Sequence, residues 1–156
     1  MKRNAVLAAT VLGLVIALGA APAHAAVQDP EVDPQITAML EEVPGGIVLD
    51  ATSAVWPELG MELKVASASG ISARSVGSCA TGKICAYNAN SLGGSALSFA
   101  TCAVHAIPSS FTVKSVANAR TSGFVQVRNG TTVLKTVYAG TWANISGSTT
   151  NLRCTL

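Results

Sequence analysis

The sequence predicts an all-β fold, a sandwich of two antiparallel sheets, preceded by a short segment that contains one helix. Three observations predict it. From residue 71 onward, short apolar runs alternate with turn residues. Serine and threonine are abundant within these runs, which suits sheets with one buried and one polar face. The Asn129-Gly130 pair lies between two such runs and is typical of a tight hairpin with a type I′ turn.

The first 25 of the 156 residues are typical of a secretory signal peptide. Lys2 and Arg3 form the positive start, residues 5–21 are almost entirely apolar, and an Ala-His-Ala motif ends at Ala25. A retained membrane anchor is the alternative, because the apolar run is long enough to span a bilayer. An acidic, proline-containing stretch follows instead of basic residues. We therefore expect cleavage after Ala25 and a secreted, extracellular protein that does not associate with the membrane after cleavage.

Residues 34–43 are expected to form a short amphipathic helix. Asp33 suits the position before the first turn and Pro34 suits the first helical position. Apolar residues then recur at helical spacing on one face, and Pro44-Gly45-Gly46 ends the pattern. A helix this short is not stable alone in water, so it must dock on the rest of the protein.

Strands are expected along the remainder of the mature chain. A Ser-Ala-Ser-Gly stretch at 67–70 separates an acidic N-terminal segment, 26–66, from a β domain, 67–156. The acidic segment is either a pro-region removed after export or a permanent extension of the sheet, and its strand-like runs favour the extension. The expected strands are 47–49, 54–56, 61–65, 71–78, 83–88, 95–100, 112–119, 123–128, 132–138, 141–145 and 149–154.

Charge is distributed very unevenly. Every carboxylate lies between residues 29 and 62, whereas eight bases and no carboxylate follow from Lys64 onward. The β domain therefore lacks paired carboxylates, a Ser-His-Asp triad and the ligands of a calcium or two-metal centre. His105, the only histidine of the mature chain, has no acid there to orient it. We expect neither an enzyme nor a cofactor or metal site. The bases either bind an anionic polymer or, as we favour, neutralise the acidic segment.

Export makes disulfides the expected state of Cys79, Cys85, Cys102 and Cys154. Zinc binding is the alternative, but the spacing does not resemble a CxxC knuckle. Four cysteines allow three pairings. Gly82 permits a tight loop between Cys79 and Cys85, which favours a local bridge and leaves Cys102 to pair with Cys154.

One stretch carries a resemblance to a known family. A C-x-x-G-x-x-C-x-Y element is followed by a glycine and an apolar strand, and Phe111–Asn118 forms a second strand ending in Ser-x-x-Asn. This arrangement resembles the bacterial peptidase inhibitor family of βγ-crystallin type, which is streptomycete metalloproteinase inhibitor-like. The resemblance implies a crystallin-like Greek-key sandwich and a secreted protein that binds peptidases, metalloproteases in particular. The residues that carry the first element are Cys79, Gly82, Cys85, Tyr87, Gly94, Leu97 and Phe99.

The chain also departs from that family. It lacks a second short cysteine pair to fix a protease-facing loop, and Asn88, Asn90 and Ser91 offer no carboxylate for a crystallin-type calcium site. The best candidate for a rigid inhibitory loop lies between Cys102 and a proline, and its His105 is a candidate ligand for a protease metal. An ordinary connection between strands is the alternative. The candidate residues are Ala103, Val104, His105, Ala106, Ile107 and Pro108.

These features favour a monomeric, non-catalytic peptidase inhibitor that inserts a loop into the cleft of an extracellular protease. One alternative is a structural or cell-surface module that binds anionic wall polymer, with Trp56 and Trp142 as possible sugar-stacking residues. Another is a toxin-like protein with the same fold, since fold alone does not determine function. Nucleic acid is not an expected partner, because the bases are scattered and aromatic residues are few.

Overall fold

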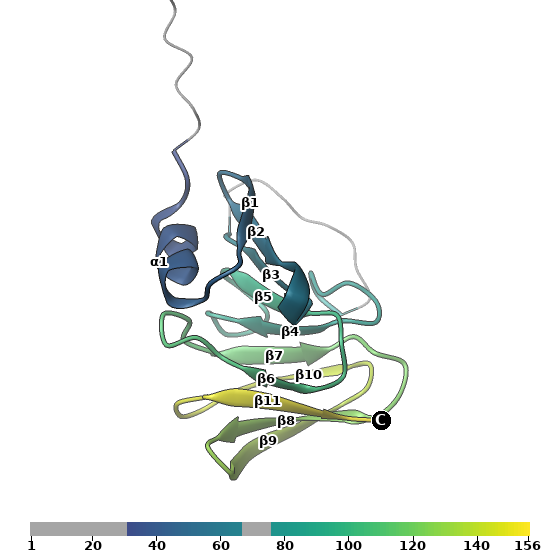
Figure 1. Ribbon diagram of the computed structural model, residues 1–156. Helices are drawn as coiled ribbons and strands as arrows, with labels where there is room; N and C mark the ends of the chain where they lie inside the picture. The colour runs from purple at the N-terminus through teal and green to yellow at the C-terminus, as the bar shows by residue number, and fades with distance from the viewer. Residues whose placement is uncertain (1–30, 67–75) are drawn as a thin grey trace, which may run out of the picture.

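The computed structural model describes residues 31–66 and 76–156, which form two antiparallel sheets and one α-helix, α1 (Pro34–Glu42) (Figure 1). The expected signal peptide, the expected boundary at 67–70 and most of the expected strand 71–78 lie outside the described residues. The prediction of a mostly β protein with one short helix is therefore confirmed. No helix in the described part is long and apolar enough to cross a membrane.

The larger sheet has seven strands in the order β1-β2-β3-β5-β4-β7-β10, and the smaller sheet has four in the order β6-β11-β8-β9. A short 3-10 helix, Pro57–Leu59, follows β2. The strands are β1 (Ile47–Asp50), β2 (Ser53–Trp56), β3 (Met61–Lys64), β4 (Ile84–Tyr87), β5 (Ala96–Phe99), β6 (Val104–Ala106), β7 (Ser115–Asn118), β8 (Phe124–Asn129), β9 (Thr132–Tyr138), β10 (Thr141–Asn144) and β11 (Asn151–Thr155).

The helix α1 begins and docks as its sequence predicts. The Asp33 carboxylate accepts a hydrogen bond of 2.8 Å from the backbone N–H of Gln35, which satisfies one of the free donors of the first turn. Ile36 and Met39 are completely buried in the main core. The helix ends at Glu42, one residue earlier than expected.

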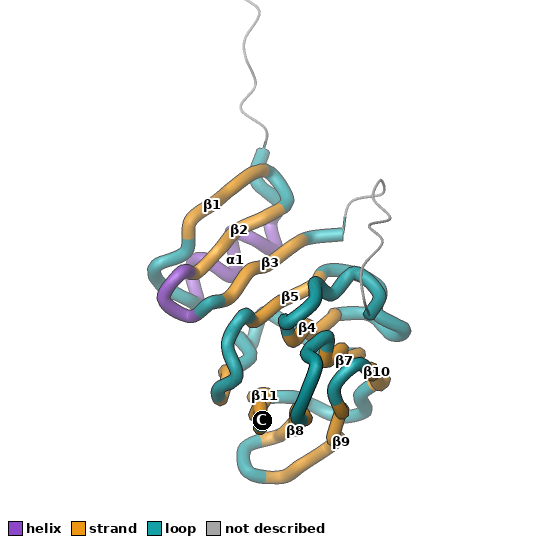
Figure 2. The backbone as a smooth tube through the Cα atoms, turned by 90° about the vertical axis from the view of Figure 1, so that its right-hand side faces the viewer, coloured by secondary structure: helices purple, strands orange, loops and turns teal. Residues whose placement is uncertain are grey.

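The acidic segment is part of the larger sheet. β3 pairs with β5 in the register Met61↔Phe99 and Leu63↔Leu97, so the segment continues the sheet of the β domain. Trp56 is buried in the shared core and donates its indole N–H to the carbonyl oxygen of Val43 at 2.8 Å. In Figure 2, α1 and β1–β3 lie at one end of the molecule and β8, β9 and β11 at the other. This arrangement favours a permanent extension over a removable pro-region.

Two clusters of buried side chains hold the sheets together. The main core lies between them and joins Leu63 and Leu97 of the larger sheet to Val125 and Leu152 of the smaller one. A second cluster, built around the buried Cys85 and Tyr87, packs on the opposite face of β4 and β7. Both faces of these two strands are therefore covered, and every residue in them is buried.

The hairpin predicted at the Asn-Gly pair is present, but the predicted turn type is wrong. Asn129 is the last residue of β8 and pairs with Thr132, so the two-residue loop consists of Gly130 and Thr131. Gly130 takes φ +57°, which a glycine adopts without steric cost. The pairing Asn129↔Thr132 places the loop one residue beyond the position that a type I′ turn on Asn129-Gly130 requires, and the register shift between Val127 and Arg128 marks a bulge beside it.

All four cysteines form disulfides, Cys79–Cys85 and Cys102–Cys154, the pairing that the sequence favours. The first bridge closes a loop of sequence separation 6 and the second one of 52. The second bridge ties β11, the last strand, to the residue that precedes β6 by two positions.

Candidate functional site

Within the segment expected to be an inhibitory loop, 103–108, the middle three residues form an edge strand. β6 covers Val104–Ala106 and pairs with β11 in the register Val104↔Arg153 and His105↔Leu152. It occupies the end of the smaller sheet. The disulfide Cys102–Cys154 brings the segment alongside β11, so extended pairing replaces a free loop. Three residues of alternating burial are too short a pattern to be identified in the sequence.

His105, the candidate ligand for a protease metal, is buried against the core. Only 7 % of the residue is exposed, and its ring stacks on Phe99 with the centroids 4.4 Å apart. Its Nε2 lies 2.9 Å from the carbonyl oxygen of Thr101. The imidazole therefore points into the protein and fixes β6 to the core. It does not project toward a partner.

The outer edge of β6 carries backbone groups that another chain can reach. Ala103 accepts a hydrogen bond from the N–H of Cys154, and the N–H of Ile107 donates to Thr150, each at 2.9 Å. Because antiparallel pairing alternates along a strand, the N–H and C=O groups of Val104 and Ala106 face away from β11. No other strand of residues 31–66 or 76–156 flanks that side. Val104 is 63 % exposed, so its side chain is accessible as well.

Both ends of this segment are fixed. At its start, the Cys102–Cys154 bridge holds the two Cα atoms 5.0 Å apart. At its end, the Glu42 carboxylate accepts hydrogen bonds from the backbone N–H groups of Ser109 and Ser110. Hydrogen bonds from Ser110, and to a smaller extent from Ser109, lower the pKa of Glu42 to about 2. We call the fixed stretch Cys102–Pro108 the β6 edge.

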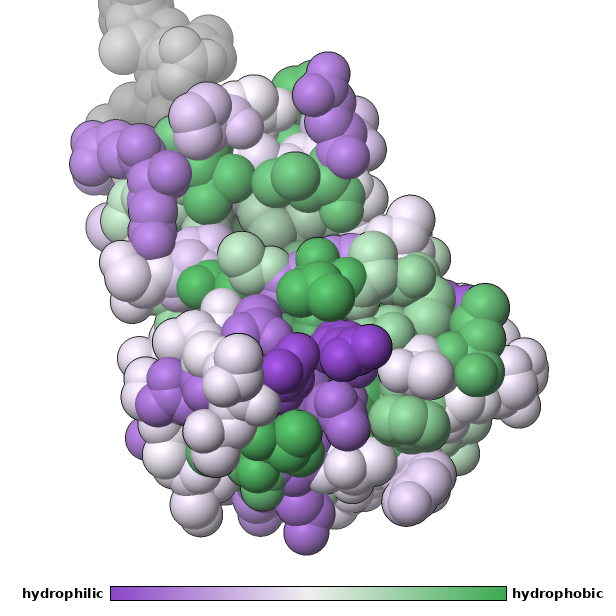
Figure 3. Space-filling view, turned by 60° about the horizontal axis from the view of Figure 1, so that its bottom comes forward, coloured by the Kyte–Doolittle hydropathy of each residue, from purple (hydrophilic) through white to green (hydrophobic). Residues whose placement is uncertain are grey.

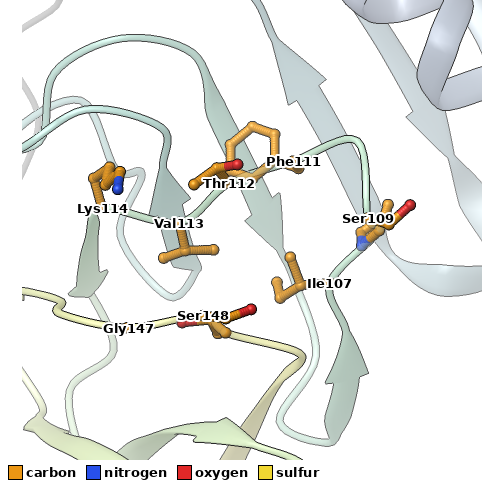
Figure 4. A pocket seen from close by; sticks show the side chains of 10 residues that line it. Ile107, Ser109, Phe111, Thr112, Val113, Lys114, Gly147 and Ser148 are labelled. Carbon is orange, nitrogen blue, oxygen red and sulfur yellow. The ribbon is translucent and has the colours of Figure 1, made fainter.

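A pocket of about 410 Å³ adjoins the end of the β6 edge. Ile107, Phe111 and Val113 form its apolar wall, and Gly147 and Ser148 lie opposite them (Figure 4). Polar groups stand at its rim, among them the exposed Lys114. The pocket is therefore placed to accept an apolar side chain of a partner chain that pairs with β6.

The turn that joins β4 and β5 is a second rigid feature. Ser91 and Leu92 both have left-handed backbone conformations, φ 56° and 62°, which are uncommon for residues other than glycine. Their N–H groups donate to the side chains of Asn144 and Ser115, at 2.8 and 3.0 Å. These hydrogen bonds to residues distant in sequence stabilise the strained turn. The sequence did not indicate the role of Asn144, which lies 53 residues away.

The motif residues of the family resemblance lie around the same turn. Tyr87 is completely buried and its hydroxyl accepts a hydrogen bond of 3.0 Å from Ser78. Gly94 takes φ +73°, and a Cβ there would collide with the side-chain oxygen of Asn88. Gly82 also has positive φ, +83°, within the loop that the Cys79–Cys85 bridge closes. These residues stabilise the β4–β5 hairpin from within. The β6 edge is more accessible to a partner than they are.

Among the described residues no group of three or more His, Cys, Asp and Glu side chains is placed to hold a metal ion. Comparison of the chain with protein-family models, with curated proteins and with solved structures finds no match.

Proposed function

We propose that this protein is a secreted, non-catalytic peptidase inhibitor that occupies a protease cleft with the β6 edge. The observation that carries the proposal is an exposed, extended segment that is fixed at both ends before any partner binds. Peptides often bind by adding a strand to the edge of another chain, with backbone hydrogen bonds giving affinity and side chains giving specificity. A segment that is already extended loses little conformational entropy on binding.

The proposed contact differs from the one expected from sequence. Val104 and Ala106 present both their outward backbone groups and their exposed side chains, whereas His105 anchors the strand from below. The partner chain pairs with the outer side of β6 and places one side chain in the pocket beside Ile107. Because the contact uses backbone groups and small apolar side chains, binding depends little on salt concentration.

The compartment and family assignments are parts of the same proposal. Two disulfides suit an oxidising, extracellular environment, in agreement with the expected signal peptide. The Cys79–Cys85 bridge, the buried Tyr87 and the left-handed Gly94 support a crystallin-like Greek-key arrangement within the two antiparallel sheets. Metalloproteases are the first targets to test, because the resemblance to the inhibitor family implies them. We propose that the inhibitor acts as a monomer.

The test is a titration of the purified mature protein, residues 26–156, against a panel of metalloproteases and serine proteases. We expect inhibition that V104P weakens at least tenfold, because proline removes the outward N–H and leaves the hydrogen bonds to β11 intact. V133P is the matched control: Val133 is an exposed valine on β9, the opposite edge strand of the same sheet.

Two outcomes would contradict the proposal. Absence of inhibition by the wild-type protein at micromolar concentration, in both protease classes, would exclude the inhibitor function. Equal inhibition by V104P and wild type would leave inhibition standing but remove the β6 edge as the contact.

A further inference from the structure

The outer face of the smaller sheet is exposed and has a composition distinct from the β6 edge. Val125, Val127 and Leu152 point into the core, so the residues between them along β8 and β11 point outward. The strand register places these outward residues side by side, with Arg153 opposite Gln126 and Asn151 opposite Arg128. We call this surface the outer face, defined by Phe124, Gln126, Arg128, Tyr138, Asn151 and Arg153.

Aromatic rings occupy one end of the outer face. Phe124 and Tyr138 are cross-strand partners, with ring centroids 6.2 Å apart and a tilt of 59°. Tyr138 is 63 % exposed, so most of its ring is accessible to a ligand. Exposed aromatic rings of this kind stack on the apolar faces of sugar rings.

Guanidinium and amide groups occupy the other end. Arg153 is exposed on β11, and Arg128 on β8 donates from Nη2 to the carbonyl oxygen of Thr131 at 3.0 Å. The Nε atom of Arg128 and the side-chain oxygen of its cross-strand neighbour Asn151 are buried, so neither is accessible to a ligand. Arg153 is therefore the more accessible guanidinium group at this end of the face.

Within residues 31–66 and 76–156, no carboxylate of the acidic segment forms an ion pair with a base of the outer face. The ion pairs among residues 31–66 and 76–156 both use Glu62, with Lys83 at 2.7 Å and Lys64 at 3.9 Å. Glu62 is also the last carboxylate side chain in the sequence. Its strand, β3, belongs to the larger sheet, so the strands that form the outer face carry basic side chains and no acidic one.

We propose that the outer face binds an acidic polysaccharide, a second binding activity beyond protease inhibition. Guanidinium groups pair with carboxylate or phosphate oxygens through charge-assisted hydrogen bonds. The amide of Gln126 matches sugar hydroxyls, because an amide both donates and accepts. Tyr138 supplies the stacking surface. Figure 3 shows strongly hydrophilic residues gathered near the centre of the view, with hydrophobic residues beside them.

The experiment measures binding of the mature protein to four immobilised polymers: polygalacturonate, which carries carboxylates, teichoic acid, which carries phosphates, neutral dextran, and the nucleic acid oligo-dT. We expect binding to at least one acidic polymer, weakening as sodium chloride is added, and none to dextran. R153Q is expected to weaken binding about tenfold, because a hydrogen bond to a charged group is lost. Y138A is expected to weaken it severalfold through the lost stacking surface.

K64Q is the matched control, because the Lys64 side chain is 56 % exposed but lies on β3 of the larger sheet. It removes the same charge as R153Q and is expected to change binding little. Thermal unfolding of each variant verifies that these surface substitutions leave the fold intact.

Three results would overturn the proposal: no binding to either acidic wall or plant polymer, polygalacturonate or teichoic acid; equal weakening by K64Q and R153Q; or tighter binding to oligo-dT than to polygalacturonate and teichoic acid. The last would indicate a single-stranded nucleic acid site. None of these results affects the protease titration, so the two proposals fail independently.

Discussion

Single residues at the ends of the β6 edge show how far apart in sequence its supports lie. Glu42, at the end of α1, hydrogen-bonds the backbone of Ser109 and Ser110, 67 and 68 residues further along. His105 contributes from beneath by stacking on Phe99. Neither contact follows from a local pattern, because a carboxylate on an exposed helix turn and a lone histidine occur in many sequences without such partners.

Glu42 predicts a dependence of stability on pH. Its pKa is lowered from 4.5 to about 2 in the folded protein, so its contribution is present above pH 4.5 and is lost as the pH falls toward 2. E42Q is therefore expected to lower the free energy of unfolding at neutral pH by less than about 1 kcal/mol, since water competes at this exposed carboxylate.

Denaturant unfolding at several pH values measures this effect. The difference between E42Q and wild type is expected to shrink toward pH 2. The neighbouring exposed residue Glu41 provides the control variant, E41Q. A difference that stays constant over the whole pH range would show that the carboxylate charge is not what stabilises the Ser109-Ser110 turn.

At the scale of elements, β6 depends on its disulfide and on one neighbour. It pairs with β11 alone and is three residues long, so its extended form rests on the Cys102–Cys154 bridge at one end. A more central strand has no such bridge: β7 has a partner on each side, contains no cysteine, and all four of its residues are buried. A disulfide therefore contributes more to the extended conformation of a short edge strand than to that of a central strand.

The double variant C102A/C154A tests this dependence. The bridge closes a long loop, so its removal is expected to lower the free energy of unfolding by about 2–4 kcal/mol. It is also expected to weaken protease inhibition, because the β6 edge is no longer held extended. C79A/C85A opens a much shorter loop and serves as the comparison, with a smaller entropic loss and inhibition retained. Undiminished inhibition by C102A/C154A would show that β6 is rigid without its bridge.

At the scale of the whole molecule, the acidic segment and the β domain form one folding unit with an uneven charge. β3 covers the edge of β5, and Ile36, Met39 and Trp56 complete the main core. The seven carboxylates of residues 31–62 thus lie just before α1, in α1, in β1 and β3, and in the 3-10 helix between β2 and β3, while the smaller sheet is basic. Such a separation suits a protein that binds different partners at different places.

A chain that begins at residue 67 is expected to lack a cooperative unfolding transition, because it loses one wall of the core and exposes the edge of β5. The full mature chain is the control. Intact mass of the secreted protein gives the second check, with a chain that begins at Ala26 expected. A stable secreted species that begins between residues 64 and 70 would instead identify the acidic segment as a pro-region.

The sequence by itself determined the elements with strong local patterns: the helix after Asp33, the β8–β9 hairpin, most of the strands and the pairing of the cysteines. Capping, alternation and turn residues act over a few positions, so they can be identified along the chain. Only the tertiary structure decided that 104–106 is an edge strand, that His105 is buried, and that the outer face keeps its positive charge. These properties depend on which distant segments pack together, since burial, strand neighbours and charge pairing are set by contacts between residues far apart in sequence.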